Sequence, residues 1–229
     1  MDISPVIVAV ASSAEDLEAI CELLCALPAE CAAAFVIAQH VDPSRERVLF
    51  ETLSQSATVP VVRAQEGLVA EPRHVYLMSA NTTLTISGGR IRVTPNPGGP
   101  HHPGDTLLTS VAEDQGHGAV GVVLSGAGSD GALGIQAIER AGGAAFAQYP
   151  GSARFPSMPI SAIETGCVHF VLRPNEIARE LAPLSRKPRD APGPPDGEAV
   201  MRGLSRPSDV TRAAASPPLF ASRASTERL

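Results

Sequence analysis

The sequence contains no tryptophan, and aromatic residues make up only 3% of its 229 positions. Apolar residues still reach 44%, so the core must be built from Val, Ile, Leu and Ala, as in buried parallel strands. No apolar run is long enough for a membrane span, and no basic region precedes an apolar one at the N-terminus, so we expect neither membrane insertion nor a secretory signal. The four cysteines form no CxxC pair, and we expect reduced thiols in a cytoplasmic protein.

The charge is unevenly distributed along the chain. The net charge is −6, but residues 186–229 hold eight Lys and Arg against five Asp and Glu. The preceding part is therefore more acidic than the total indicates, which argues against nucleic acid as a partner. The same terminal segment has seven prolines and little periodicity. We therefore expect one folded domain at 1–185 and a disordered tail at 186–229.

Strand-like and helix-like segments alternate through the first 181 residues. Strands are expected at 5–10, 33–39, 59–64, 119–124, 143–148 and 168–172, and helices at 14–27, 44–56, 105–115, 131–141, 159–165 and 175–181. Residues 74–94 alternate differently and are split by Asn81 and Gly88-Gly89, which predicts an antiparallel hairpin excursion. The fold class expected is α/β: a doubly wound, mostly parallel sheet of the three-layer Rossmann-like kind with that hairpin inserted.

Ser13 follows the first predicted strand, at the edge of a parallel sheet where sites form. Its hydroxyl could act as a nucleophile, and the backbone N–H of the next residue could bind an oxyanion. The alternative is purely structural, because Ser12-x-x-Glu15 matches a helix capping box. Both interpretations can hold together, with Ser12 capping and Ser13 reacting.

His40 and Asp130 also lie where predicted strands end. His40 would accept the proton of Ser13 as a general base, and Asp130 would orient the imidazole. Each residue has a structural alternative: His40 as a hydrogen-bonded loop histidine, and Asp130 as a turn aspartate that bonds its local backbone. Together with Ser13, however, they form the set that nucleophilic acyl transfer needs.

Two other patterns indicate cofactor sites only weakly. Gly126-x-Gly128-x-x-Gly131 is a literal GxGxxG, but it lies late in the chain and no acidic residue occurs in 141–154. His101, His102 and Asp105 cluster in a Pro/Gly-rich loop, which is little support for a metal site. We therefore expect no cofactor and no metal.

Five ordered segments resemble the catalytic domain of the chemotaxis protein-glutamate methylesterases (CheB-type), over about residues 5–182. They are Ala11-Ser12-Ser13-Ala14-Glu15-Asp16, Gln39-His40, HVYLMSA (74–80), Ser125-Gly126-Ala127-Gly128-Ser129-Asp130-Gly131 and FPSMPISAIETG (155–166). The register of the first segment places Ser13, rather than Ser12, at the family's nucleophile. The resemblance implies hydrolysis of glutamate γ-methyl esters, and deamidation of glutamines, on methyl-accepting chemoreceptors or related sensory proteins. It also implies Ser13, His40 and Asp130 as the triad, with oxyanion donors at the backbone N–H groups of Ala14 and Ala127.

The chain departs from the family pattern around the triad. Glu15-Asp16 replaces Gly-Gly, Ala127 replaces a methionine, and the His101–Asp105 loop is one residue shorter and lacks arginine. We therefore expect reduced or altered activity in a catalytic domain that stands without a receiver domain. The alternative to an esterase is a catalytically weakened binding module in a sensory complex, and nucleotide binding through the glycine turn is a third option.

Overall fold

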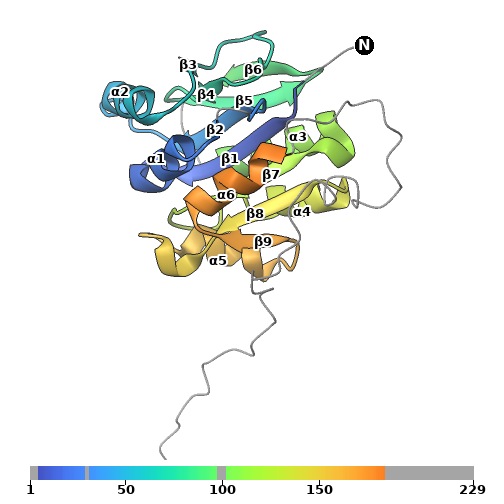
Figure 1. Cartoon of the computed structure of the whole chain (residues 1–229). Helices are drawn as coiled ribbons and strands as arrows, with labels where there is room; N and C mark the ends of the chain where they lie inside the picture. The colour runs from blue at the N-terminus through green and yellow to red at the C-terminus, as the bar shows by residue number, and fades with distance from the viewer. Residues whose placement is uncertain (1–4, 29–30, 97–101, 184–229) are drawn as a thin grey trace, which may run out of the picture.

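The computed structural model describes residues 5–28, 31–96 and 102–183. Within these residues, the main sheet has seven parallel strands in the order β3-β4-β2-β1-β7-β8-β9 (Figure 1). The strands are β1 (Ile7–Ser13), β2 (Ala34–His40), β3 (Val61–Arg63), β4 (Val75–Leu77), β7 (Val120–Val123), β8 (Ala144–Gln148) and β9 (Phe170–Leu172). A second, antiparallel pair is formed by β5 (Thr82–Ser87) and β6 (Arg90–Pro95).

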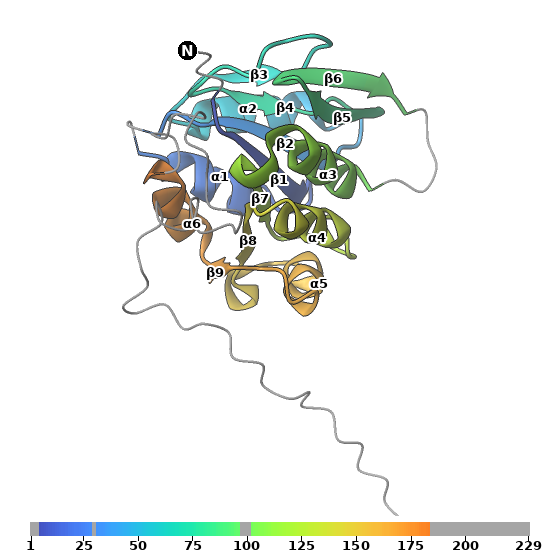
Figure 2. The same ribbon diagram turned by 90° about the vertical axis from the view of Figure 1, so that its right-hand side faces the viewer.

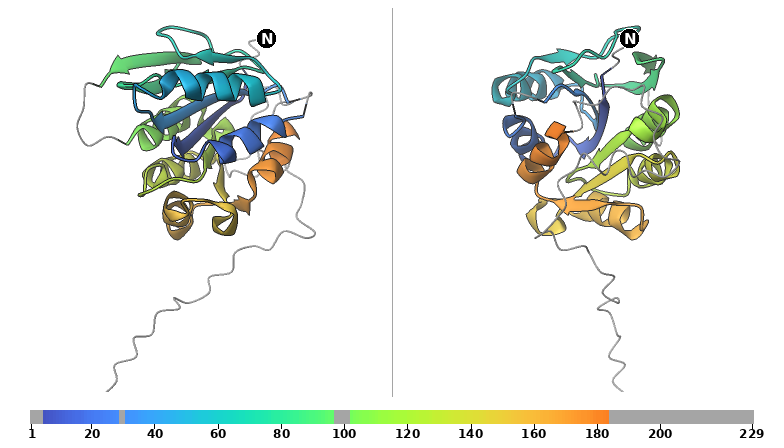
Figure 3. Two further views of the ribbon diagram at one scale, coloured as in Figure 1. Left: turned by 90° about the vertical axis from the view of Figure 1, so that its left-hand side faces the viewer. Right: turned by 45° about the vertical axis from the view of Figure 1, so that its right-hand side comes forward.

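Helices cover both faces of the main sheet (Figures 2 and 3). They are α1 (Leu17–Cys25), α2 (Glu46–Ser56), α3 (Pro103–Gln115), α4 (Ala132–Arg140), α5 (Ser157–Glu164) and α6 (Pro174–Leu181). Helices α1, α2 and α6 pack on one face, where Val8 and Val10 of β1 point. Helices α3, α4 and α5 pack on the other, where Ala9 and Ala11 point.

This alternation follows from the pleat of β1, whose successive side chains face opposite layers. The central strands are apolar on both faces, as expected for a parallel sheet buried between helices. The hairpin β5–β6 packs on α3: Leu84, Ile86 and Ile91 belong to the same core cluster as Leu107 and Val111. The predicted doubly wound class and the hairpin are thus both confirmed.

The order in which strands are added to the sheet reverses at β1. β2 lies on one side of β1 and β7 on the other, and the helices that follow β1 and β7 cover opposite faces. In open α/β sheets, a crevice forms at the carboxyl ends of the strands beside such a reversal. Ser13, at the end of β1, is therefore at the position where this fold builds its sites.

Two sequence expectations are wrong in detail. Residues 75–77 belong to the parallel main sheet as β4, between β3 and β2, and only β5 and β6 form the hairpin. Ser12 does not cap a helix: β1 continues through Ser13, and α1 begins only after Asp16.

The predicted boundary at 185 and the tail at 186–229 lie outside the described residues. None of the helices in the described part is long and apolar enough to cross a bilayer.

Candidate active site

Ser13 and His40 end neighbouring strands at the same level. They are paired in the parallel register of β1 and β2, as Ala11 and Ala38 are two residues earlier. The Ser13 N–H donates to the carbonyl of Ser125 at 3.1 Å, which ties the end of β1 to the segment that follows β7. His40 is placed by its backbone alone, because its side chain lies outside the described part of the structure. The Ser13 side chain is half-buried.

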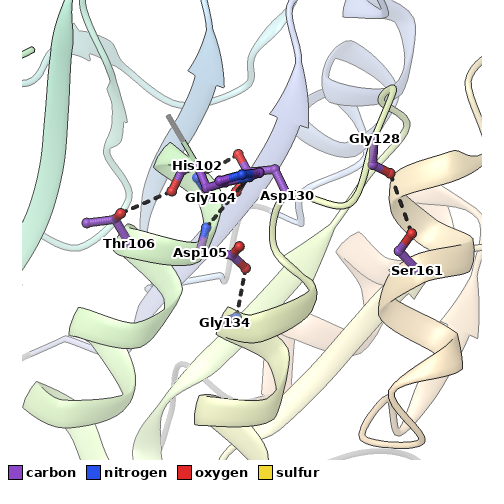
Figure 4. A network of polar contacts seen from close by, with 8 residues as sticks. All are labelled: His102, Gly104, Asp105, Thr106, Gly128, Asp130, Gly134 and Ser161. Carbon is purple, nitrogen blue, oxygen red and sulfur yellow. Dashed lines mark hydrogen bonds and ion pairs between the residues drawn. The ribbon is translucent and has the colours of Figure 1, made fainter. Parts of the chain in front are cut away.

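Asp130 is buried, with 5% of its surface exposed. Its Oδ2 accepts the N–H of Gly104 at 2.9 Å, and its Oδ1 accepts the N–H of Asp105 at 2.8 Å (Figure 4). Both donors belong to the first turn of α3, where backbone N–H groups lack partners within the helix. The carboxylate therefore bonds a distant helix start, and the positive end of α3 stabilises its negative charge.

Asp130 and Ser13 approach the same face of β1. A Cβ built on Gly104 would lie 2.6 Å from the Cβ of Ala11 and 3.0 Å from Oδ2 of Asp130. A Cβ on Gly131 would lie 3.2 Å from the same Ala11 Cβ. Ala11 precedes Ser13 by two residues and so shares its face. The turn that carries Asp130 therefore packs over β1 directly before the serine.

The turn after β7 comes close to Ser13. A Cβ on Gly126 would lie 3.1 Å from the Cβ of Ser13 and 2.0 Å from Sδ of Met158, so a larger residue would displace the Met158 side chain and crowd the serine. The Gly126 N–H donates to the Phe155 carbonyl at 2.9 Å, and its own carbonyl accepts the Met158 N–H at 3.0 Å. Gly128 adopts φ of +88°, which favours glycine. The backbone beside the serine is thus fixed from two sides.

A side chain of β8 and the backbone of the following loop brace this turn. The Ser125 N–H donates to Oε1 of Gln148 at 2.8 Å, and Nε2 of Gln148 donates to the Ser152 carbonyl at 3.1 Å. The Phe155 N–H donates to Oγ of Ser125 at 3.0 Å. These bonds join the segment after β7 to β8 and to the loop that follows β8, beyond the last paired residues of the two strands. β8 therefore also contributes to the geometry around Ser13.

The two expected oxyanion donors are backbone N–H groups of the segments that meet at Ser13 and Gly126. The N–H groups of Ala14 and Ala127 have no acceptor within the described residues; Ala14 is half-buried and Ala127 is exposed. Ala14 follows Ser13 in the chain and Ala127 follows Gly126, and Ser13 and Gly126 lie close together. The Glu15 N–H donates to Oγ of Ser13 at 3.2 Å, so the exposed Glu15 side chain begins close to the hydroxyl.

One group of side chains has the residue types of a metal site. Ligand atoms of His102, Asp105 and Asp130 all lie within 4.8 Å of one another. Each oxygen of Asp130 already accepts a backbone N–H, however, and the group lies at the positive ends of α3 and α4, which oppose a cation. The arrangement favours a hydrogen-bonded cluster over coordination. His101 lies outside the described residues.

The surroundings of Asp105 displace the pKa of its carboxyl. Partial burial raises the pKa of its carboxyl, and the negative charge of Asp130 raises it further, while an N–H bond from Gly134 acts in the opposite direction. Sequence reasoning missed that Gly104 and Asp105 hold Asp130. The available signal was Pro103 followed by Gly-Asp, which marks a helix start but not what packs against it.

Comparison with known proteins identifies the family of this chain. A family model described as CheB methylesterase matches residues 8–181. The chain belongs to the CheB methylesterase family. A crystal structure of the Thermotoga maritima CheB methylesterase catalytic domain has a TM-score of 0.70 and 25% identity, and the match covers 77% of this chain and 96% of that one.

Several known proteins are similar in sequence. Protein-glutamate methylesterase/protein-glutamine glutaminase 1 of Myxococcus xanthus (strain DK1622) is 33% identical over 191 residues, covering 81% of this chain and 55% of that protein. An uncharacterized 104.1 kDa protein of Rhodobacter capsulatus is 39% identical over 139 residues, covering 60% of this chain and 15% of that protein. The chain spans about half the length of the first curated CheB relatives it matches.

Proposed function

We propose that this protein is a serine hydrolase that removes the methyl group from glutamate γ-methyl esters on chemoreceptor-type proteins. The observation that supports it best is the convergence at one sheet edge: Ser13 and His40 are paired at the ends of β1 and β2, and the Asp130 turn packs over the same face of β1. Relatives named as protein-glutamate methylesterases support the substrate class.

The residues have the chemistry for two-step acyl transfer. His40 would take the proton from Ser13 as Oγ attacks the γ-carbonyl carbon, and the N–H groups of Ala14 and Ala127 would bind the resulting oxyanion. His40 would then return the proton to the methoxy oxygen, so that methanol leaves and an acyl-enzyme remains. Water attacks the acyl carbon, His40 takes its proton and passes it to Ser13, and the glutamate carboxylate is released.

Asp130 would hold the imidazole of His40 in the required orientation and stabilise its protonated form. The same steps with an amide in place of the ester release ammonia, which fits relatives that are also named protein-glutamine glutaminases. Glu15 directly follows the proposed donor Ala14, and a carboxylate near a developing oxyanion would oppose its negative charge. We therefore propose a slower reaction than in relatives with glycine at that position.

The proposed partners are methyl-accepting chemoreceptors or related sensory proteins. Demethylation of these proteins would serve sensory adaptation. The four cysteines are free thiols, which supports the proposed location in the reducing cytoplasm. Residues 1–185 would form the catalytic domain.

Adjacent serines provide a matched test. Purified protein is incubated with methylated receptor, and methanol is measured for the wild type, Ser13→Ala and Ser12→Ala. Ser13→Ala should reduce the release at least about 1,000-fold, as expected when a triad nucleophile is removed. Ser12→Ala should retain the wild-type rate, because Ser12 points to the opposite face of β1, towards α1.

A fluorophosphonate probe should also modify Ser13, as shown by mass spectrometry of the labelled peptide. Methanol release that survives Ser13→Ala would refute the assignment. Receptor binding without any methanol release would instead favour the binding-module alternative.

A further inference from the structure

Helices α3 and α4 begin side by side, and each is capped by an aspartate that belongs to the start of the other (Figure 4). Asp130, two residues before α4, accepts the N–H groups of Gly104 and Asp105 in the first turn of α3. Asp105, the third residue of α3, accepts the N–H of Gly134 at 2.9 Å, and Gly134 is the third residue of α4. The two caps are therefore reciprocal.

Neither helix has a side-chain cap of its own. The residues before α3 and α4 are His102 and Gly131, and neither makes a side-chain hydrogen bond to its helix. The first N–H groups of a helix need acceptors from outside it. Three of these N–H groups bond the other helix's aspartate, while that of Ala132 bonds the Ser129 carbonyl. A shift of one helix would therefore displace the carboxylate that caps its partner.

The contact beneath the caps is close enough to transmit such a shift. A Cβ on Gly134 would lie 2.4 Å from Cβ of Leu108 and 2.9 Å from its Cδ1. The backbone of α4 therefore rests directly on a side chain of α3, and the two helices pack without slack. The two carboxylates repel each other at this junction, and that repulsion contributes to the raised pKa of Asp105. The hydrogen bonds that the two carboxylates accept from helix N–H groups compensate for this repulsion.

We propose that Asp105 is a positioning residue for the active site: by holding the start of α4, it fixes the direction of the Asp130 carboxylate. This inference rests on the proposed function, in which Asp130 orients His40. Asp105 itself touches neither Ser13 nor the substrate in this account. Its effect is on the rate of the chemical step rather than on binding.

The test uses three variants on α3. Asp105→Ala removes the cap on α4, and Asp105→Asn keeps an oxygen acceptor for the Gly134 N–H. The matched control is Asp114→Ala, near the other end of the same helix, where the carboxylate accepts the N–H groups of Gly88 and Gly89 in the hairpin. Chemical denaturation of all three variants shows how much stability each cap contributes.

The first readout is fluorophosphonate labelling of Ser13, separated into the maximal inactivation rate and the probe concentration at half-maximal rate. Asp105→Ala should lower the maximal rate about 10- to 100-fold, as expected for a displaced catalytic group, without changing the half-maximal concentration. Asp105→Asn should restore most of the rate. Asp114→Ala should label like the wild type even if it is equally destabilised.

The second readout does not depend on catalysis. Hydrogen exchange at the Gly104 amide reports the bond to Asp130, and it should accelerate about tenfold or more in Asp105→Ala but not in Asp114→Ala. Wild-type labelling and unchanged Gly104 exchange in Asp105→Ala would overturn the inference, and so would failure of Asp105→Asn to restore either. If the wild type itself does not label at Ser13, the proposed function fails, and the exchange measurement alone still decides the role of Asp105.

Discussion

Replacing Gly104 with alanine should damage both the fold and the site, because the new methyl group has no space. Its Cβ would lie 2.6 Å from Cβ of Ala11 and 3.0 Å from Oδ2 of Asp130. Carbon atoms in contact normally lie about 3.5–4.0 Å apart. Ala11 is part of the central strand and has no flexible end, so the first turn of α3 must move outward by roughly the missing 1 Å.

The expected size of the effect follows from three contributions. Overpacking of a close contact costs about 1–3 kcal/mol. Weakening the 2.9 Å bond from the Gly104 N–H to a carboxylate costs up to about 1.5–3 kcal/mol. The better helix propensity of alanine returns at most about 1 kcal/mol. The net loss of unfolding free energy should be about 2–5 kcal/mol, and a carboxylate displaced by roughly 1 Å should slow catalysis about 100-fold.

Urea denaturation and the rate of fluorophosphonate labelling measure the two effects in the same preparation. Gly118→Ala is the control, because a Cβ at Gly118 meets nothing within 4 Å, and this change should alter stability by less than about 0.5 kcal/mol. A Gly104→Ala protein with the wild-type denaturation midpoint and the wild-type labelling rate would refute the reasoning that this glycine is required for close packing.

Two further predictions concern stability. Ser12 Oγ is buried and has no hydrogen-bond partner in the described part of the chain, so Ser12→Ala should leave the unfolding free energy unchanged or raise it by up to about 1 kcal/mol. Asp105 and Glu66 should give pH dependences of opposite sign. The pKa of Asp105 is raised above 3.8, mainly by burial, so its stability contribution is present below that pH and is lost as the pH rises through its folded value. The pKa of Glu66 is lowered below 4.5 by the Val93 N–H and then by Arg92, so its contribution is present above 4.5 and is lost as the pH falls through its folded value.

Urea denaturation at a series of pH values, with Asp105→Asn and Glu66→Gln beside the wild type, measures both slopes. Each variant should remove only the pH dependence of the unfolding free energy that its own carboxylate contributes. Slopes of the same sign would contradict the assignment, and a loss of more than about 1 kcal/mol in Ser12→Ala would show that its hydroxyl has a partner.

The alternation of buried strands and amphipathic helices was enough to predict the doubly wound sheet. It also placed Ser13, His40 and Asp130 at strand ends, because in a parallel sheet the carboxyl ends share one edge. The short strand β4 was harder to assign. Its residues 75–77 alternate like those of the hairpin that follows, and only its pairing with β2 and β3 decides that it belongs to the main sheet.

Local pattern failed where distant segments meet. The capping box at Ser12 was a plausible local signal, but pairing with Gln39 keeps Ser12 in β1 and moves the helix start to Leu17. The structural alternative for Asp130 was a turn aspartate that bonds its local backbone, yet two of its donors lie 26 and 25 residues earlier in the chain. Such bonds depend on how two helices pack, and neither propensity nor spacing encodes that.

The brace formed by Gln148 and Ser125 has a consequence for engineering this family. It links the loop after β8 to the segment beside Ser13 through the side chains of Ser125 and Gln148, which bond the backbone of Phe155 and Ser152. A loop graft at 149–157 taken from a relative would have to bring matching residues at 125 and 148. Without them, the transplanted loop would lose its anchor, and the backbone beside the serine would lose its support.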